Sequence, residues 1–152
     1  MPATIPTHPL LTRIDHVGIA CRNLDETVEK YHSTFGIDVV SFEVNEAQGV
    51  REAMMGVGAG HIQLLEPLGP DTPVGKFLAR RGEGIHHVGY GVADITAALT
   101  QIGGTGIRLI DKRPRHGSMG ASIAFLHPGD LSGVLTELVE APSGAKGIYK
   151  DA

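Results

Sequence analysis

The sequence predicts an α+β fold made of two copies of one β-α-β-β-β module. A strand-like segment with His-Val-Gly at its centre occurs twice, at residues 14–20 and 85–91. Each copy is followed by an amphipathic, helix-like stretch and then by three strand-like runs. Because neither half buries much apolar surface alone, we expect both modules to contribute to one curved, mixed sheet.

The first module continues from its histidine strand into a helix with clear start and stop signals. Asn23 is suited to cap the helix, and Glu26 stands three positions later, as in a capping box. Gly36 ends the apolar repeat that is formed by Leu24, Val28, Tyr31 and Phe35. Strands are then expected at residues 38–44, 50–57 and 61–65.

The second module repeats this order. Asp94 is expected to cap its helix, and Gly103 and Gly104 end it. The apolar stripe of this helix consists of Ile95, Ala98, Leu99 and Ile102. Strands are expected at residues 107–110, 122–126 and 133–139.

These elements divide the chain into four parts. The first module is expected at residues 11–66 and the second at 84–141. The connector at 67–83 should contain a short helix, and residues 142–152 have the composition of a loose tail.

The composition is that of an ordinary globular protein. Of the 152 residues, 41% are hydrophobic and 20% are charged, and no apolar run is long enough to cross a bilayer. The net charge of −4, without a basic run, argues against a nucleic-acid partner. Cys21 is the only cysteine, and the N-terminus lacks the pattern of a secretion signal, so we expect a cytoplasmic location.

Each histidine strand places an imidazole beside very small neighbours. Side chains alternate between the two faces of a strand, so His16 shares its face with Gly18 and Ala20. His87 likewise shares its face with glycines at the next two positions of that face. A packed core would fill such a space with side chains, so an open volume beside each imidazole is predicted.

The closing strand of each module adds a polar side chain at a matching position. His16 and His87 are 71 positions apart, and Gln63 and Glu137 are 74 apart. A pseudo-twofold relation between the modules would bring these four side chains together. Two imidazoles, an amide oxygen and a carboxylate suit a borderline divalent ion, so the sheet is expected to surround a metal site. Co²⁺, Mn²⁺, Ni²⁺, Fe²⁺ and Zn²⁺ are the candidates.

A further signal comes from residues 15–20, 63–68, 82–89, 125–128 and 133–138, joined by the more specific runs 45–52 and 113–120. Together these segments resemble the methylmalonyl-CoA epimerase family of the vicinal-oxygen-chelate superfamily. The resemblance implies that His16, Gln63, His87 and Glu137 bind one metal ion per chain, with Co²⁺ preferred. It also implies that Glu52 and Glu137 are the catalytic carboxylates, and that the protein is a homodimer.

The implied reaction is the epimerisation of methylmalonyl-CoA at C2. A proton would leave one face of an enolate stabilised by the metal and return to the other. For the CoA part of the substrate, we expect Ser118 and its loop to bind the thioester arm. Lys76 and Arg115 are expected to bind phosphates.

Four alternatives stay open at this point. Ethylmalonyl-CoA differs from methylmalonyl-CoA by one methylene, which a pocket discriminates by only roughly 1–3 kcal/mol. A glyoxalase I-type isomerase acting on a glutathione hemithioacetal uses similar proton transfer, but usually has an acid where Gln63 stands. A ring-cleaving dioxygenase uses three protein ligands. A metal-free antibiotic-binding protein of the superfamily would lack the metal-binding residues.

Overall fold

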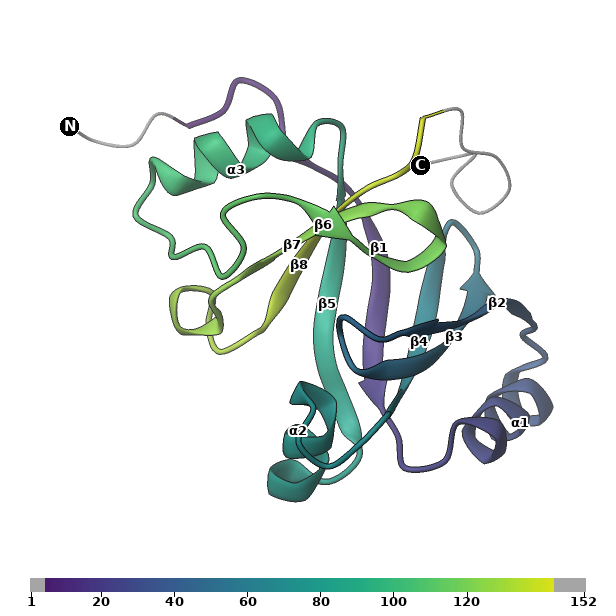
Figure 1. The fold of residues 1–152 in the computed structure, drawn as a ribbon. Helices are drawn as coiled ribbons and strands as arrows, with labels where there is room; N and C mark the ends of the chain where they lie inside the picture. Colours follow the sequence, from purple (N-terminus) through teal and green to yellow (C-terminus); the bar gives the residue numbers. More distant parts are fainter. Residues whose placement is uncertain (1–4, 144–152) are drawn as a thin grey trace. The chain divides into compact units, whose positions relative to one another are not determined.

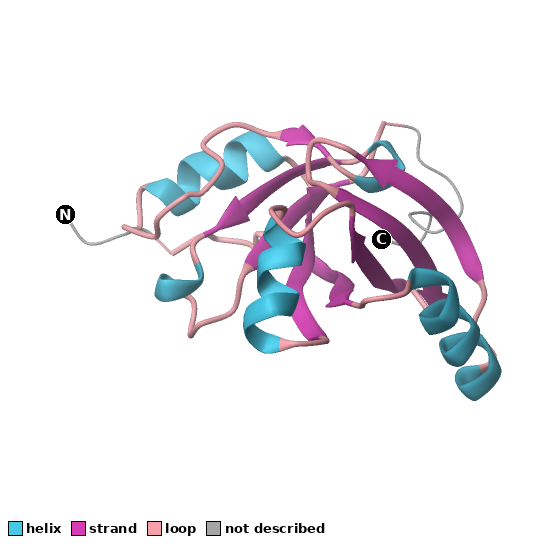
Figure 2. Cartoon of the chain, turned by 60° about the horizontal axis from the view of Figure 1, so that its bottom comes forward, coloured by secondary structure: helices cyan, strands magenta, loops and turns pink. Residues whose placement is uncertain are grey.

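The computed structural model describes residues 5–143 of the chain. Within this range the chain forms strands and helices in the order shown in Figure 1 and coloured by type in Figure 2. No helix in these residues is both long and apolar enough to cross a membrane. The strands are β1 (Leu11–Ala20), β2 (Val39–Asn45), β3 (Val50–Val57), β4 (Gly60–Pro67), β5 (Gly84–Val92), β6 (Arg115–His116), β7 (Ser122–Leu126) and β8 (Thr136–Glu140). The α-helices are α1 (Leu24–Phe35), α2 (Pro73–Arg81) and α3 (Ile95–Gly103), and the short 3₁₀ turns are η1 (Ser118–Gly120) and η2 (Pro128–Asp130).

The described residues form two compact units. One contains residues 16–86, and the other contains residues 5–15 and 87–143. Strands β1 and β5 each begin in one unit and continue in the other, and the strand order is β2-β3-β4-β1-β5-β8-β7-β6. Parallel and antiparallel pairs both occur, so the predicted α+β class with a mixed sheet is confirmed.

In the unit of residues 16–86, β1 pairs in parallel with β4, and β4 and β2 flank β3 in antiparallel pairs. Helix α1 covers one face of these strands, where Leu24 packs with Ala53 and Leu64. Helix α2 packs on the other face through Val74 and Leu78. Helix α2 therefore packs on the sheet face that carries His16, where Ala20 belongs to the same apolar cluster.

The predicted helix signals of this unit are confirmed. Asn23 accepts a hydrogen bond from the backbone N–H of Glu26 through its side chain, at 3.0 Å. Gly36 ends α1 in the left-handed conformation, with φ of 70°, which glycine adopts without steric cost. Helix α2 has Thr72 as its cap.

The other unit has the same plan. Strand β5 pairs in parallel with β8, which is antiparallel to β7, and the short β6 pairs with β7. Helix α3, capped by Asp94 as predicted, packs against β7 and β8 on one face. A second apolar cluster lies on the opposite face of these strands; it consists of Ala121, Ile123, Phe125 and Val139, with Leu135 at its edge.

Two predicted strands differ from the structure. Residues 107–110 form no strand, because only Leu109 makes a bridge, to Leu126. The last strand begins at Thr136 rather than at residue 133, since Ser132 and Gly133 both have positive φ and turn the chain. The pair β6–β7 was not predicted. Of the predicted tail at 142–152, residues 144–152 lie outside the described part of the chain.

Candidate metal centre

The unit of residues 16–86 brings His16 and Gln63 to one sheet face. In the parallel pair of β1 and β4, Gly18 is the register partner of Gln63. Paired residues of adjacent strands point to the same side, and His16 lies two positions before Gly18. The Gln63 side chain therefore occupies the face of His16, beside a residue without a side chain. Both His16 and Gln63 are 3% exposed.

The other unit repeats this arrangement with a different polar residue. Gly89 is the register partner of Glu137 in the parallel pair of β5 and β8, and His87 lies two positions before Gly89. His87 and Glu137 are both buried. The register thus reproduces the pattern histidine, glycine and polar partner that the two modules share in the sequence.

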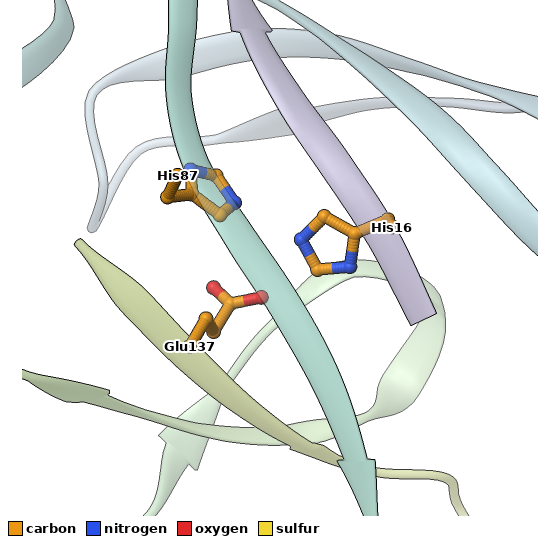
Figure 3. Close-up of side chains that lie close together, drawn as sticks. All are labelled: His16, His87 and Glu137. Atoms are coloured by element: carbon orange, nitrogen blue, oxygen red, sulfur yellow. The ribbon is translucent and has the colours of Figure 1, made fainter. Parts of the chain in front are cut away.

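Three of the four predicted ligands lie together. His16, His87 and Glu137 each offer a donor atom, and these atoms are all within 4.8 Å of one another. Figure 3 shows the two imidazoles and the carboxylate projecting toward one another from β1, β5 and β8. Two imidazoles and a carboxylate, all buried, are the donor set expected for a borderline divalent ion. The residues present therefore fit a bound metal.

Glu52 lies next to Gln63 in the structure. It is 1% exposed, on β3. The Gln63 side chain donates a hydrogen bond from Nε2 to Glu52 Oε2, at 2.6 Å. Burying a carboxylate costs free energy unless its oxygens accept hydrogen bonds, and the contact with Gln63 supplies one of these hydrogen bonds.

Aromatic contacts surround the histidine of β5. The His87 and Phe125 rings pack edge to face with centroids 5.6 Å apart. The Arg115 guanidinium also lies over the Phe125 ring, 5.5 Å from its centroid, and the Arg115 Nε is 3.3 Å from Asp111 Oδ2. Arg115 is therefore linked to His87 through one aromatic ring.

The neighbouring His86 points elsewhere. Its ring packs edge to face on Phe77 of α2, with centroids 5.1 Å apart. Burial lowers the pKa of His86 below its ordinary value of 6.5, so the ring stays neutral at neutral pH. His87, which strand alternation places on the other face of β5, belongs to the cluster with His16 and Glu137.

The residues predicted to contact CoA lie on separate elements. Ser118 begins the turn η1 and is half-buried, whereas Lys76 is exposed on α2 and Arg115 is exposed on β6. Sequence reasoning gave His61 no role. The structure pairs it in register with His16, and it is 5% exposed. Strand alternation signalled this position, since His61 shares a face with Gln63.

The fold and the donor set agree with comparisons to known proteins. The model of the glyoxalase/bleomycin resistance protein/dioxygenase superfamily matches residues 15–125. The chain belongs to this superfamily. Within it, the mitochondrial methylmalonyl-CoA epimerase of Dictyostelium discoideum is 38% identical over 130 residues, which are 84% of this chain and 78% of that protein. An ethylmalonyl-CoA/methylmalonyl-CoA epimerase of Cereibacter sphaeroides is 34% identical, over 85% of this chain and 98% of its own.

A solved structure extends the superfamily likeness to three dimensions. A variant of the Streptomyces coelicolor methylmalonyl-CoA epimerase, in complex with 2-nitronate-propionyl-CoA, superposes with a TM-score of 0.84 at 52% identity. The match covers 88% of this chain and 99% of that one. The resemblance to epimerases of this superfamily is thereby confirmed. These relatives favour the epimerase over the glyoxalase I, dioxygenase and antibiotic-binding alternatives.

Proposed function

We propose that this protein is a metal-dependent epimerase that interconverts the 2R and 2S forms of methylmalonyl-CoA. The observation that carries the proposal is the cluster of His16, His87 and Glu137, with donor atoms within 4.8 Å of one another. The similar proteins of D. discoideum and S. coelicolor are named methylmalonyl-CoA epimerases.

The metal would be held by His16, His87, Glu137 and, as fourth ligand, Gln63. The amide oxygen of Gln63 is a neutral donor, so one carboxylate balances only half of a divalent charge. We propose Co²⁺ as the native ion, while Mn²⁺, Ni²⁺, Fe²⁺ and Zn²⁺ accept the same donors. When bound, the ion supplies a Lewis acid that stabilises negative charge on the oxygens of the substrate enolate.

The chain must also supply two proton carriers. C2 of methylmalonyl-CoA lies between a thioester carbonyl and a carboxylate, and inversion requires that one face loses a proton and the other gains one. We propose Glu52 and Glu137 for these two roles. The side chains of Glu52 and Glu137 are 1% and 5% exposed. This burial supports the assignment, because bulk water is excluded from the place where the proton would be transferred. Glu137 would combine this role with metal binding.

Three residues are proposed to hold the CoA part of the substrate. Ser118 would contact the thioester arm, because it stands half-buried at the start of η1. Arg115 would bind a phosphate, since its guanidinium is already placed by Phe125 and Asp111. Lys76, which is exposed on α2, would bind another phosphate.

The name of one relative suggests a second substrate. The C. sphaeroides relative is named for both ethylmalonyl-CoA and methylmalonyl-CoA. We therefore propose that this protein also accepts ethylmalonyl-CoA. We further propose that it acts as a homodimer in the cytoplasm. The single buried cysteine, Cys21, is consistent with a reducing compartment.

The decisive measurement is deuterium incorporation at C2 of methylmalonyl-CoA in heavy water. The wild type with Co²⁺ should exchange this proton in both epimers, and Glu52→Gln should slow the exchange of the epimer whose proton Glu52 removes by about 10²–10⁴-fold, because a general base is lost. Glu29→Gln is the matched control, since Glu29 is exposed on α1. Unchanged exchange in Glu52→Gln would remove Glu52 from the proton transfer. Turnover of the methylglyoxal–glutathione adduct instead of methylmalonyl-CoA would overturn the epimerase assignment.

A further inference from the structure

Glu52 and Gln63 form a buried pair on two neighbouring strands. Met54 is the register partner of Gln63 in the antiparallel pair of β3 and β4, and Glu52 lies two positions from Met54 on the same face. Diagonal neighbours of this kind are within reach of long side chains. The Nε2–Oε2 distance of 2.6 Å is that of a short hydrogen bond from the amide to the carboxyl group.

The hydrogen bond with Glu52 determines the orientation of the Gln63 side-chain amide. The two ends of a glutamine side chain are nearly equal in size, but only the oxygen can bind a cation. An ionised carboxylate only accepts hydrogen bonds, so Glu52 selects the NH₂ end of Gln63. The Oε1 end then faces away from Glu52. A reversed amide would set two oxygens against each other in a buried place, which is costly.

We infer that Glu52 is the positioning residue of the metal centre: it holds the Gln63 amide so that Oε1, and not Nε2, is presented to the ion. The inference rests on the proposed function for the identity of Gln63 as a ligand. In this role Glu52 acts before any proton transfer, and it uses only one of its carboxylate oxygens, Oε2. A hydrogen bond from Nε2 to a carboxylate also polarises the amide and makes Oε1 a stronger donor to a cation.

The test is the affinity of the substrate-free protein for Co²⁺, measured by titration of the visible absorption of the bound ion. Glu52→Gln keeps an oxygen that can accept from Gln63 Nε2, so its affinity should stay within about threefold of the wild type. Glu52→Leu removes the acceptor, and its affinity should fall by about 10–100-fold, as for other residues that orient a ligand.

A shorter acid separates positioning from charge. Glu52→Asp keeps the negative charge but withdraws the carboxylate by one methylene, so it should bind Co²⁺ more weakly than Glu52→Gln. If the charge alone mattered, the order would be reversed, and the inference would fail. Because aspartate is small and polar, the Glu52→Asp variant can still be tested if the Glu52→Leu variant does not fold.

A double-mutant cycle identifies the residue through which Glu52 acts. In a Gln63→Ala background, Glu52→Leu should cause no further loss of Co²⁺ affinity, because the amide that it orients is gone. An equal loss in both backgrounds would show that Glu52 acts otherwise and would overturn the inference. The absorption bands should shift in Glu52→Leu and Gln63→Ala alike, since both change the ligand sphere.

The same variants keep this inference distinct from the proposed function. Deuterium incorporation at saturating Co²⁺ tests the chemistry, whereas the substrate-free titration tests the amide. Absence of exchange in the wild type would refute the epimerase while leaving the affinity pattern intact. Exchange in the wild type with wild-type affinity in Glu52→Leu would refute the positioning role alone.

Discussion

At the scale of single residues, the candidate site depends on glycines placed beside its donors. Gly18 pairs in register with Gln63, and Gly89 with Glu137. Each polar side chain therefore lies beside a residue that has no side chain. Strand alternation predicted from the sequence that each histidine shares its face with small residues. The register that places Gly18 beside Gln63 and Gly89 beside Glu137 was not predicted. The Gln63–Glu52 hydrogen bond could not be predicted, because it depends on the diagonal register of β3 and β4.

A third glycine of the histidine strands has a different role, which the sequence did not reveal. A Cβ at Gly91 would clash with Nη1 and Cζ of Arg13. That guanidinium forms an ion pair with Asp15 at 2.9 Å, and the Asp15 side chain is 1% exposed. The space at Gly91 thus admits the cation that balances a buried acid.

We therefore predict that Gly91→Ala lowers the free energy of unfolding by about 2–3 kcal/mol, because Arg13 must move away from the buried Asp15. Urea denaturation followed by circular dichroism measures the change. Gly84→Ala is the matched control on the same strand, since a Cβ there meets nothing within 4 Å. The control should change the free energy by less than about 1 kcal/mol. Equal effects of the two substitutions would contradict this explanation.

At the scale of elements, each module uses its closing strand twice. Three positions after Gln63, the Glu66 carboxylate accepts a hydrogen bond from the backbone N–H of Leu24 at the start of α1, at 2.7 Å. Three positions after Glu137, Glu140 accepts one from Ile95 at the start of α3, at 2.9 Å. The same strand thus bears a proposed metal ligand and holds the first turn of its module's helix.

The helix contacts lead to a prediction for both modules. Glu66→Ala and Glu140→Ala should each lower the free energy of unfolding by about 1 kcal/mol, since a first-turn N–H loses its acceptor and the helix dipole loses a nearby negative charge. Glu66→Gln and Glu140→Gln should recover part of this loss, because an amide oxygen can still accept. Chemical denaturation of the four variants checks the order. Glutamine variants no more stable than the alanine variants would show that the acceptor is unimportant.

The elements also show where sequence patterns are insufficient. The helices were predicted well because capping residues and apolar spacing are local signals. The strand expected at residues 107–110 fails because an apolar run forms a strand only if a neighbour pairs along it, and only Leu109 finds such a partner. The two-residue strand β6 lies in a loop and depends wholly on its pairing with β7.

At the scale of the whole molecule, the candidate ligands are far apart in the sequence, from His16 to Glu137. An ion bound by these residues is a ligand of the folded chain alone, because the unfolded chain does not hold the donors together. Metal binding and folding stability are therefore thermodynamically linked. The module pattern predicted that His16, His87 and Glu137 converge together with Gln63, and the donor atoms of the first three lie within 4.8 Å of one another in the folded chain.

The linkage predicts how stability depends on the metal. Free Co²⁺ at about 100 times its dissociation constant should stabilise the protein by roughly 2.7 kcal/mol. For a chain of this size that corresponds to a rise in Tm of roughly 5–10 °C over the protein treated with a chelator. His16→Ala should abolish most of the rise, because it removes a ligand, whereas His8→Ala, at an exposed position before β1, should retain it. Differential scanning calorimetry with and without Co²⁺ measures both. A rise of equal size in His16→Ala would mean that the ion binds elsewhere, and the four-ligand centre would have to be abandoned.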